Sequence, residues 1–92
     1  MPELSHAAIK IYGQVQGVFY RAFASRIAKS LNLRGYVRNL PHGVVEVVAE
    51  GNRDKLEDLI NQLHAGPPES LVENLEVAWS DFTGQFVNFE IK

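Results

Sequence analysis

The sequence predicts an α+β fold in which two amphipathic helices cover one face of an antiparallel sheet. Segments with alternating apolar residues, typical of strands, are separated by two segments with apolar residues every three or four positions, typical of helices. Their order is β-α-β-β-α-β plus a C-terminal strand, which predicts a two-layer α/β sandwich of the ferredoxin-like, split βαβ kind. The 92 residues suffice for one core, so residues 1–92 are expected to form a single domain.

The first part of the chain predicts a strand and a helix joined by a loop that contains glycine. Residues 8–15, AIKIYGQV, alternate between apolar and polar side chains, which predicts the first strand. Residues 22–33 carry an apolar stripe with a spacing of four, which predicts the first helix. Gly35 follows closely and is expected near the C-terminal cap of this helix.

A hairpin is predicted in the middle of the chain. Residues 36–40 predict a short strand, and the sequence LPHG then predicts a type I turn, with Pro41 at its second position and Gly43 at its fourth. The β-branched residues of 44–50, VVEVVAE, predict the returning strand. Because crossover connections are right-handed, the first and third strands are expected side by side at the centre of the sheet.

The last third of the chain predicts a second helix and two strands. Residues 53–64 show an apolar stripe at helical spacing, with Asn52 as the N-cap and the sequence GPP at 66–68 as the stop. Residues 72–82 predict the fourth strand, and the final FVNFEIK predicts one more. The apolar residues that alternate in this last strand are Val87, Phe89 and Ile91.

Composition and charge exclude several classes of function. The net charge is −2, so the surplus of basic residues typical of general nucleic-acid binders is absent. The chain has no cysteine, which excludes disulfides and thiolate metal sites and is compatible with the cytoplasm, the expected location. We expect no signal peptide, and no apolar stretch reaches the ~20 residues that span a bilayer.

The sequence GQVQGVFYR, residues 13–21, places an arginine at the start of the first helix, directly after two glycines. A cation there lies at the unfavourable end of the helix dipole, at a cost of about 0.3–1 kcal/mol. A bound anion would remove this cost, since free N–H groups of such a loop bind anions and the guanidinium of Arg21 can hold two phosphate oxygens. The alternative is a solvated arginine beside an ordinary loop, because neither feature is specific alone.

Asn39 is expected near this loop, since the C-terminal ends of the first two strands lie at the same end of the sheet in this topology. Arg38 alternates to the opposite face and is not expected in the same pocket.

The three histidines lie on a tail, a turn and a helix end, so no metal site is expected. Packing roles are expected for the three tyrosines, which are Tyr12, Tyr20 and Tyr36.

Two stretches, IYGQVQGVFYR and GYVRNLPHGVVEVVAEG, resemble the signature motifs of the acylphosphatase family. The first departs mildly from the family pattern, with Tyr20 where phenylalanine is usual. The second departs at His42, which replaces an acidic residue or asparagine. The agreeing positions are Ile11, Gly13, Val15, Gln16, Gly17, Val18 and Arg21 in the first motif, and Gly35, Tyr36, Val37, Arg38, Asn39, Gly43, Val45 and Gly51 in the second. The resemblance extends over nearly the whole chain.

The resemblance implies an enzyme that hydrolyses acyl phosphates to a carboxylate and inorganic phosphate, with no metal, cofactor or covalent intermediate. It implies that Arg21 binds the phosphate and that Asn39 positions the attacking water. It also implies a phosphate-binding loop formed by the backbone N–H groups of Gln16, Gly17, Val18, Phe19 and Tyr20. The expected partners are a small-molecule acyl phosphate and inorganic phosphate as product or inhibitor, with no nucleic acid and no membrane, and the expected state is a monomer.

The implied chemistry agrees with these residue types. The leaving carboxylate has a conjugate acid with a pKa of roughly 4, so no general acid is needed. Neither arginine nor asparagine can act as a base, so the proton of the water is expected to pass to a phosphate oxygen of the substrate. The residues do not select among acetyl phosphate, a phosphorylated aspartate and a glycolytic acyl phosphate.

Three rival functions are compatible with the fold. An RNA-binding module of the same element order needs aromatic residues on its first and third strands, and residues 44–50 contain none. A non-catalytic anion-binding domain and a scaffold that associates through an edge strand are the other two. The presence of Asn39 together with Arg21 favours the enzyme, because a binding module has no use for a residue that positions water.

Overall fold

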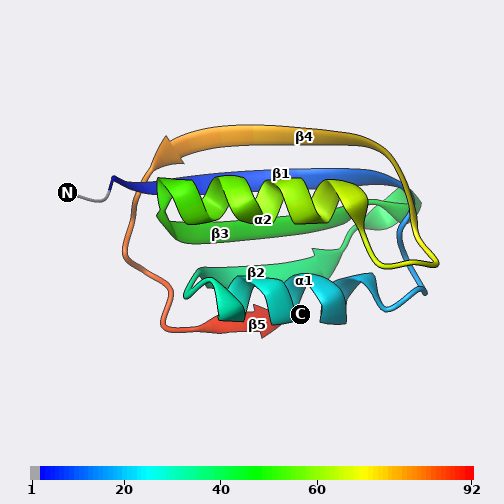
Figure 1. Ribbon diagram of the computed structural model, residues 1–92, viewed down its shortest axis with the longest axis horizontal. Coiled ribbons are helices and arrows are strands. Elements are labelled where there is room, and N and C mark those ends of the chain that lie inside the picture. Colours follow the sequence, from blue (N-terminus) through cyan, green and yellow to red (C-terminus); the bar gives the residue numbers. More distant parts are fainter. Residues whose placement is uncertain (1–2) are drawn as a thin grey trace.

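The computed structural model describes residues 3–92 and has the two-layer architecture that the sequence predicts (Figure 1). The elements in chain order are β1 (Leu4–Gln14), α1 (Tyr20–Ser30), β2 (Arg34–Asn39), the short 3₁₀ helix η1 (Pro41–Gly43), β3 (Val45–Asn52), α2 (Arg53–Ala65), β4 (Leu71–Asp81) and β5 (Phe89–Ile91). The strands lie in the order β4-β1-β3-β2-β5. This order confirms the ferredoxin-like α+β fold and the central position of the first and third strands.

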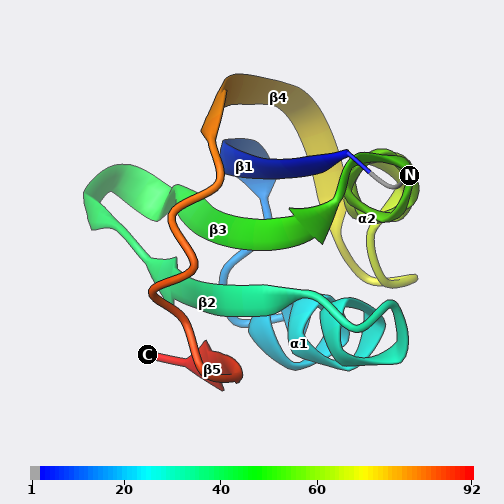
Figure 2. The ribbon, with the colours of Figure 1, turned by 90° about the vertical axis from the view of Figure 1, so that its left-hand side faces the viewer.

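The sheet is mixed, because the last strand joins it in the parallel sense. The first four strands pair antiparallel, as predicted, in the pairs β1–β3, β1–β4 and β2–β3. In contrast, β5 pairs parallel with β2, with Val37 opposite Ile91. The linker 82–88 leaves the end of β4 and crosses to the opposite edge of the sheet at the same end of the molecule (Figures 1 and 2). β5 therefore starts from that end and runs alongside β2.

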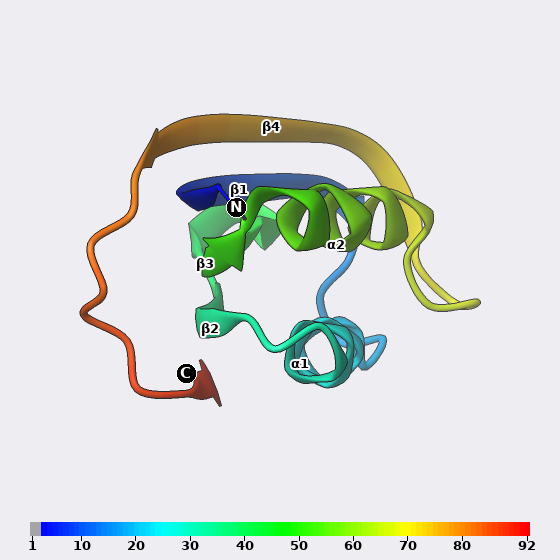
Figure 3. The ribbon, with the colours of Figure 1, turned by 60° about the vertical axis from the view of Figure 1, so that its left-hand side comes forward.

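Both helices pack on one face of the sheet, as Figure 3 shows. α2 contacts β1 and β3, and α1 contacts β2 and β5. The predicted alternation in β1 is confirmed, with Ala7, Ile9 and Ile11 buried beneath the helices. Burying such side chains provides most of the stabilisation, at roughly 1.5–3 kcal/mol for each large aliphatic residue. The helical stripe that faces them from α2 consists of Leu56, Leu59 and Leu63.

The two helices end and begin in different ways. The N-cap prediction for α2 is confirmed, since the side chain of Asn52 accepts a hydrogen bond from the backbone N–H of Asp54 at 3.0 Å. The C-cap prediction for Gly35 is wrong, because α1 already ends at Ser30 and Asn32 takes the left-handed conformation there, with φ 59°. Gly35 instead lies in β2, where a Cβ atom would stand 1.8 Å from the backbone oxygen of Val48.

Two further local predictions are wrong. The turn between β2 and β3 is not type I, because His42 at its third position has φ 66° and ψ 26°, whereas a type I turn needs a negative φ there. The last strand is shorter than predicted: Phe89 is buried, but Val87 lies in the linker and is 84% exposed. Alternation cannot reveal that only three residues of this segment pair with β2.

Candidate active site

The loop between β1 and α1 has a backbone conformation that leaves its N–H groups free. Gly17 has φ +76°, and a Cβ atom there would meet nothing within 4 Å, so the glycine serves the backbone conformation and not close packing. Phe19, the N-cap residue of α1, also has a left-handed backbone, with φ 62°. Within residues 3–92, the backbone N–H groups of Gln16 to Tyr20 have no protein acceptor. Such successive free N–H groups at a helix N-terminus suit an anion.

The side chain of Gln16 ties this loop to the connection between β2 and β3. Its Nε2 donates hydrogen bonds to the backbone oxygens of Leu40 and Val44, both at 2.9 Å. These two carbonyls flank η1, so one amide group fixes the loop against the end of β2. The sequence predicts only a backbone role for Gln16. The side-chain role depends on a tertiary contact and has no signal in local spacing.

The loop, the start of α1 and the ends of β2 and β5 enclose a pocket of about 300 Å³. The pocket brings Arg21 and Asn39 together, as the topology predicts, and Gly17 lies beside them. Phe19 and Tyr20 of the predicted phosphate-binding loop also line the pocket, whereas Gln16 and Val18 do not. The full lining consists of Val15, Gly17, Phe19, Tyr20, Arg21, Ala22, Asn39 and Ile91.

Arg21 lies in the first turn of α1, where no acidic side chain accompanies it. Its Nη1 donates a hydrogen bond to a main-chain oxygen of Lys92 at 3.0 Å. The backbone N–H of Lys92 in turn donates to the oxygen of Val37 in β2 at 2.8 Å. A guanidinium has five N–H donors, so this contact orients Arg21 and leaves donors for an anion. No local sequence pattern indicates this contribution of the last strand, because it depends on the parallel pairing of β5.

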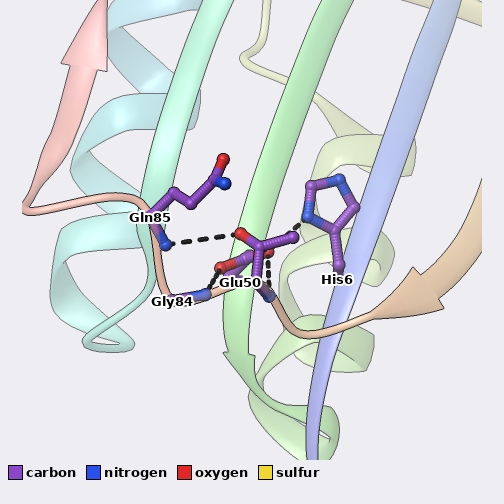
Figure 4. Close-up of polar contacts among 5 residues, drawn as sticks. His6, Glu50, Gly84 and Gln85 are labelled. Atoms are coloured by element: carbon purple, nitrogen blue, oxygen red, sulfur yellow. Dashed lines mark hydrogen bonds and ion pairs between the residues drawn. The ribbon is translucent and has the colours of Figure 1, made fainter.

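The linker that leads to β5 is anchored on the buried carboxylate of Glu50 in β3, which is 2% exposed (Figure 4). This carboxylate accepts hydrogen bonds from the backbone N–H of Thr83 at 2.9 Å, from its Oγ1 at 2.7 Å and from the backbone N–H of Gly84 at 3.0 Å. His6 Nδ1 lies 2.5 Å from the same carboxylate. Burial alone would raise the pKa of the Glu50 carboxyl, but these hydrogen bonds lower it below its ordinary value of 4.5.

Tyr20, at the end of the loop, anchors the loop to the core. Its ring is buried, and its hydroxyl donates a hydrogen bond to the backbone oxygen of Leu63 in α2. Burial raises the pKa of this hydroxyl, so Tyr20 stays neutral and serves as an anchor between the two helices. The packing role expected for Tyr20 agrees with this position. Neither Tyr12 nor Tyr36 lines the pocket.

The other charged candidates lie away from the pocket. Arg38 pairs with Glu46 at 2.6 Å, and it points away from the pocket that Asn39 lines, as strand alternation predicts. His42 is exposed in the turn and is not a lining residue. Across residues 3–92, no three His, Cys, Asp or Glu side chains gather in a group that could hold a metal ion. None of the helices in this part of the chain is long and apolar enough to cross a membrane.

Comparison with known proteins places this geometry in one family. The family model described as acylphosphatase matches residues 7–91. An acylphosphatase of Methanococcoides burtonii is 46% identical over 90 residues, which cover 98% of this chain and 94% of that protein. The crystal structure of acylphosphatase from Bacillus subtilis superposes with a TM-score of 0.93 at 32% identity, covering 96% of this chain and 98% of that one. The structure of an acylphosphatase from Coxiella burnetii superposes with a TM-score of 0.86 at 36% identity, covering 98% of this chain and 94% of that one.

The matches identify the class of enzyme as the hydrolases that act on acid anhydrides. The chain belongs to the acylphosphatase family, as the two motifs of the sequence indicate, and this part of the prediction is confirmed. The match spans nearly the whole chain. It therefore includes the glycine loop, the start of α1 and the end of β2, the three segments that form the pocket.

Proposed function

We propose that this protein hydrolyses acyl phosphates, the mixed anhydrides of a carboxylic acid and phosphoric acid, to a carboxylate and inorganic phosphate. The observation that carries the proposal is the shared pocket of Arg21 and Asn39 beside free loop N–H groups, in a chain of the acylphosphatase family. The pocket offers positive charge and hydrogen-bond donors for a phosphate. Phosphoryl transfer depends mainly on such positioning and charge stabilisation.

The phosphate group binds between Arg21 and the loop. The guanidinium donates to two phosphate oxygens, and the N–H groups of Gln16 to Tyr20 donate to the others. The bond from Arg21 to the main-chain oxygen of Lys92 holds the guanidinium at the pocket before the substrate arrives. A donor set that is oriented in advance stabilises the charge of the transition state without reorganisation.

Asn39 orients the attacking water. Its side-chain carbonyl accepts a hydrogen bond from the water and directs a lone pair of the water oxygen at phosphorus. The bond from water oxygen to phosphorus forms as the bond from phosphorus to the carboxylate oxygen breaks. The leaving group departs as a carboxylate, and the proton of the water passes to a phosphate oxygen. A rate profile without a steep side-chain titration near pH 7 is expected from this route.

The proposed reaction needs no metal ion. A carboxylate leaves without protonation, and the cationic arginine with the loop N–H groups balances the phosphate charge, which is the task of Mg²⁺ in many phosphoryl transfers. We further propose that the protein acts as a cytoplasmic monomer on small-molecule acyl phosphates, with inorganic phosphate as product and competitive inhibitor.

Two variants separate phosphate binding from water positioning. Arg21→Ala is expected to lose phosphate binding and to lower kcat/KM for benzoyl phosphate by roughly 10³-fold or more. Asn39→Ala is expected to lower kcat by roughly 10²-fold and to keep its affinity for inorganic phosphate. The matched control is Arg38→Ala, which removes the same charge on the opposite face. Normal phosphate affinity in Arg21→Ala, or normal turnover in Asn39→Ala, would refute the assigned role.

A further inference from the structure

The pocket has an apolar rim that the phosphate chemistry does not use. Phe19 is one of the residues that line the pocket and is 83% exposed, and Ile91 from β5 lines it from another element and is 50% exposed. The polar side of the same pocket carries Arg21 and Asn39. One pocket therefore combines a site for an anionic group with an apolar surface next to it.

The fold itself gives no reason for a phenylalanine at position 19. As the N-cap residue of α1 it makes no side-chain capping bond, although serine, threonine, aspartate and asparagine do so readily. Its backbone is left-handed, a conformation in which glycine and asparagine are favoured and bulky residues are rare. Its ring contributes almost nothing to the core, since it remains exposed. Strained residues of this kind concentrate at ligand-binding sites.

We propose that Phe19 determines substrate specificity by receiving the acyl group, so that the protein favours acyl phosphates with an aromatic or extended apolar acyl group over acetyl phosphate. This inference rests on the proposed function. Once Arg21 and the loop hold the phosphate, the acyl group must extend from it toward the pocket opening. Phe19 precedes Arg21 by two residues and offers its ring at that opening, with Ile91 as a second apolar contact. Stacking covers both the ring and the acyl group from water.

The preference is measured as the ratio of kcat/KM for benzoyl phosphate to kcat/KM for acetyl phosphate. In Phe19→Gly the ring is lost while the residue suits the left-handed backbone, and the ratio is expected to fall roughly five- to tenfold. The fall is expected mainly as a higher KM for benzoyl phosphate, because a contact with a non-reacting group stabilises ground state and transition state alike. Phe19→Tyr keeps an aromatic ring and is expected to keep the ratio.

The matched control is Phe82→Ala, which removes an exposed phenylalanine ring that does not line this pocket and should leave the ratio unchanged. An unchanged ratio in Phe19→Gly would overturn the specificity role. An equal loss of kcat/KM for both substrates, together with weaker inhibition by inorganic phosphate, would also overturn the specificity role, because Phe19 would then act only through the loop. A wild-type protein that hydrolyses neither substrate refutes the proposed function itself. Hydrolysis of both at a ratio insensitive to Phe19 refutes only this inference.

Discussion

At the scale of single residues, the candidate site depends on backbone conformation as much as on side-chain chemistry. Gly17 and Phe19 both have left-handed backbones, and the loop that contains them presents N–H groups that have no acceptor within residues 3–92. Arg21 adds the charge, and Gln16 holds the loop in place through its side chain. Each of these residues therefore affects the bound phosphate by a different physical route.

Gly17 tests the backbone route. Gly17→Ala has open space around the new methyl group but a left-handed φ of +76°, so it is expected to cost about 1 kcal/mol of stability and to weaken phosphate binding as the loop changes shape. Gly84→Ala is the control for a left-handed φ outside the pocket, since Gly84 has a φ of +70°. Its new Cβ atom would also stand 3.2 Å from the ring of Phe82, so its stability cost is expected to be the larger of the two. Urea unfolding and inhibition by phosphate measure the two effects. Equal phosphate affinity in Gly17→Ala and the wild type would contradict a binding role for the loop conformation.

The site residues that can be predicted from the sequence are those with a local signal. Arg21 stands out because a cation at a helix N-terminus is unfavourable without an anion, and Asn39 follows from topology and motif. The side-chain bonds of Gln16 and the oxygen of Lys92 beside Arg21 depend on segments far apart in the chain. The left-handed backbone of Phe19 is also hidden, because an aromatic residue seldom adopts it.

At the scale of elements, the last strand and its linker complete one side of the pocket. β5 is only three residues long, yet it brings Ile91 to the pocket and directs the chain to Lys92 beside Arg21. Phe89 anchors it in the core, and Glu50 anchors the linker at the far end of the sheet (Figure 4). The position of β5 thus depends on a buried carboxylate.

The anchor predicts a dependence of stability on pH. Because hydrogen bonds lower the pKa of Glu50 in the folded protein, its contribution is fully present above its ordinary pKa of 4.5 and is lost as the pH falls through the lower folded value. Glu50→Gln is expected to cost roughly 2 kcal/mol at pH 7, and less in acid, where the wild type loses the same interactions. Urea unfolding of both proteins at neutral and acidic pH measures this. A stability difference that does not shrink in acid would contradict the charged anchor.

The elements differ in how much of them the sequence predicts. Both helices, the central position of β1 and β3 and the N-cap at Asn52 follow from periodicity, from handedness and from a capping side chain. Strand ends and turns do not, because they depend on backbone conformations such as the left-handed His42 and on close contacts such as Gly35 against Val48. The parallel pairing of β5 follows from the path of the linker, which no periodic pattern records.

At the scale of the whole molecule, the sheet and helices hold three separate segments at one end of the fold. Lining residues from the segment 15–22 meet Asn39 and Ile91 there, although the three segments are far apart in sequence. A rigid framework of this kind orients donors before a ligand binds, which lowers the cost of binding. Ligand binding should therefore stabilise the folded state as a whole.

Inorganic phosphate is expected to raise the thermal midpoint of the wild type. At a phosphate concentration ten times the Kd, the free energy of unfolding increases by about 1.4 kcal/mol. This increase corresponds to a rise in the thermal midpoint of roughly 6–10 °C for a domain of this size. Arg21→Ala is expected to show almost no shift. Thermal unfolding followed by circular dichroism, with chloride at equal ionic strength as the control salt, measures both. An equal shift in the two proteins would show that phosphate acts away from the pocket.

Metal-free hydrolysis of acyl phosphates is tested by the rate at which the wild-type protein hydrolyses benzoyl phosphate in excess EDTA. Turnover well above the spontaneous rate is expected, because Arg21, Asn39 and the loop N–H groups supply the catalysis without a metal. A folded protein with no turnover would contradict acyl phosphate hydrolysis. Activity that EDTA abolishes and a divalent cation restores would contradict the metal-free mechanism.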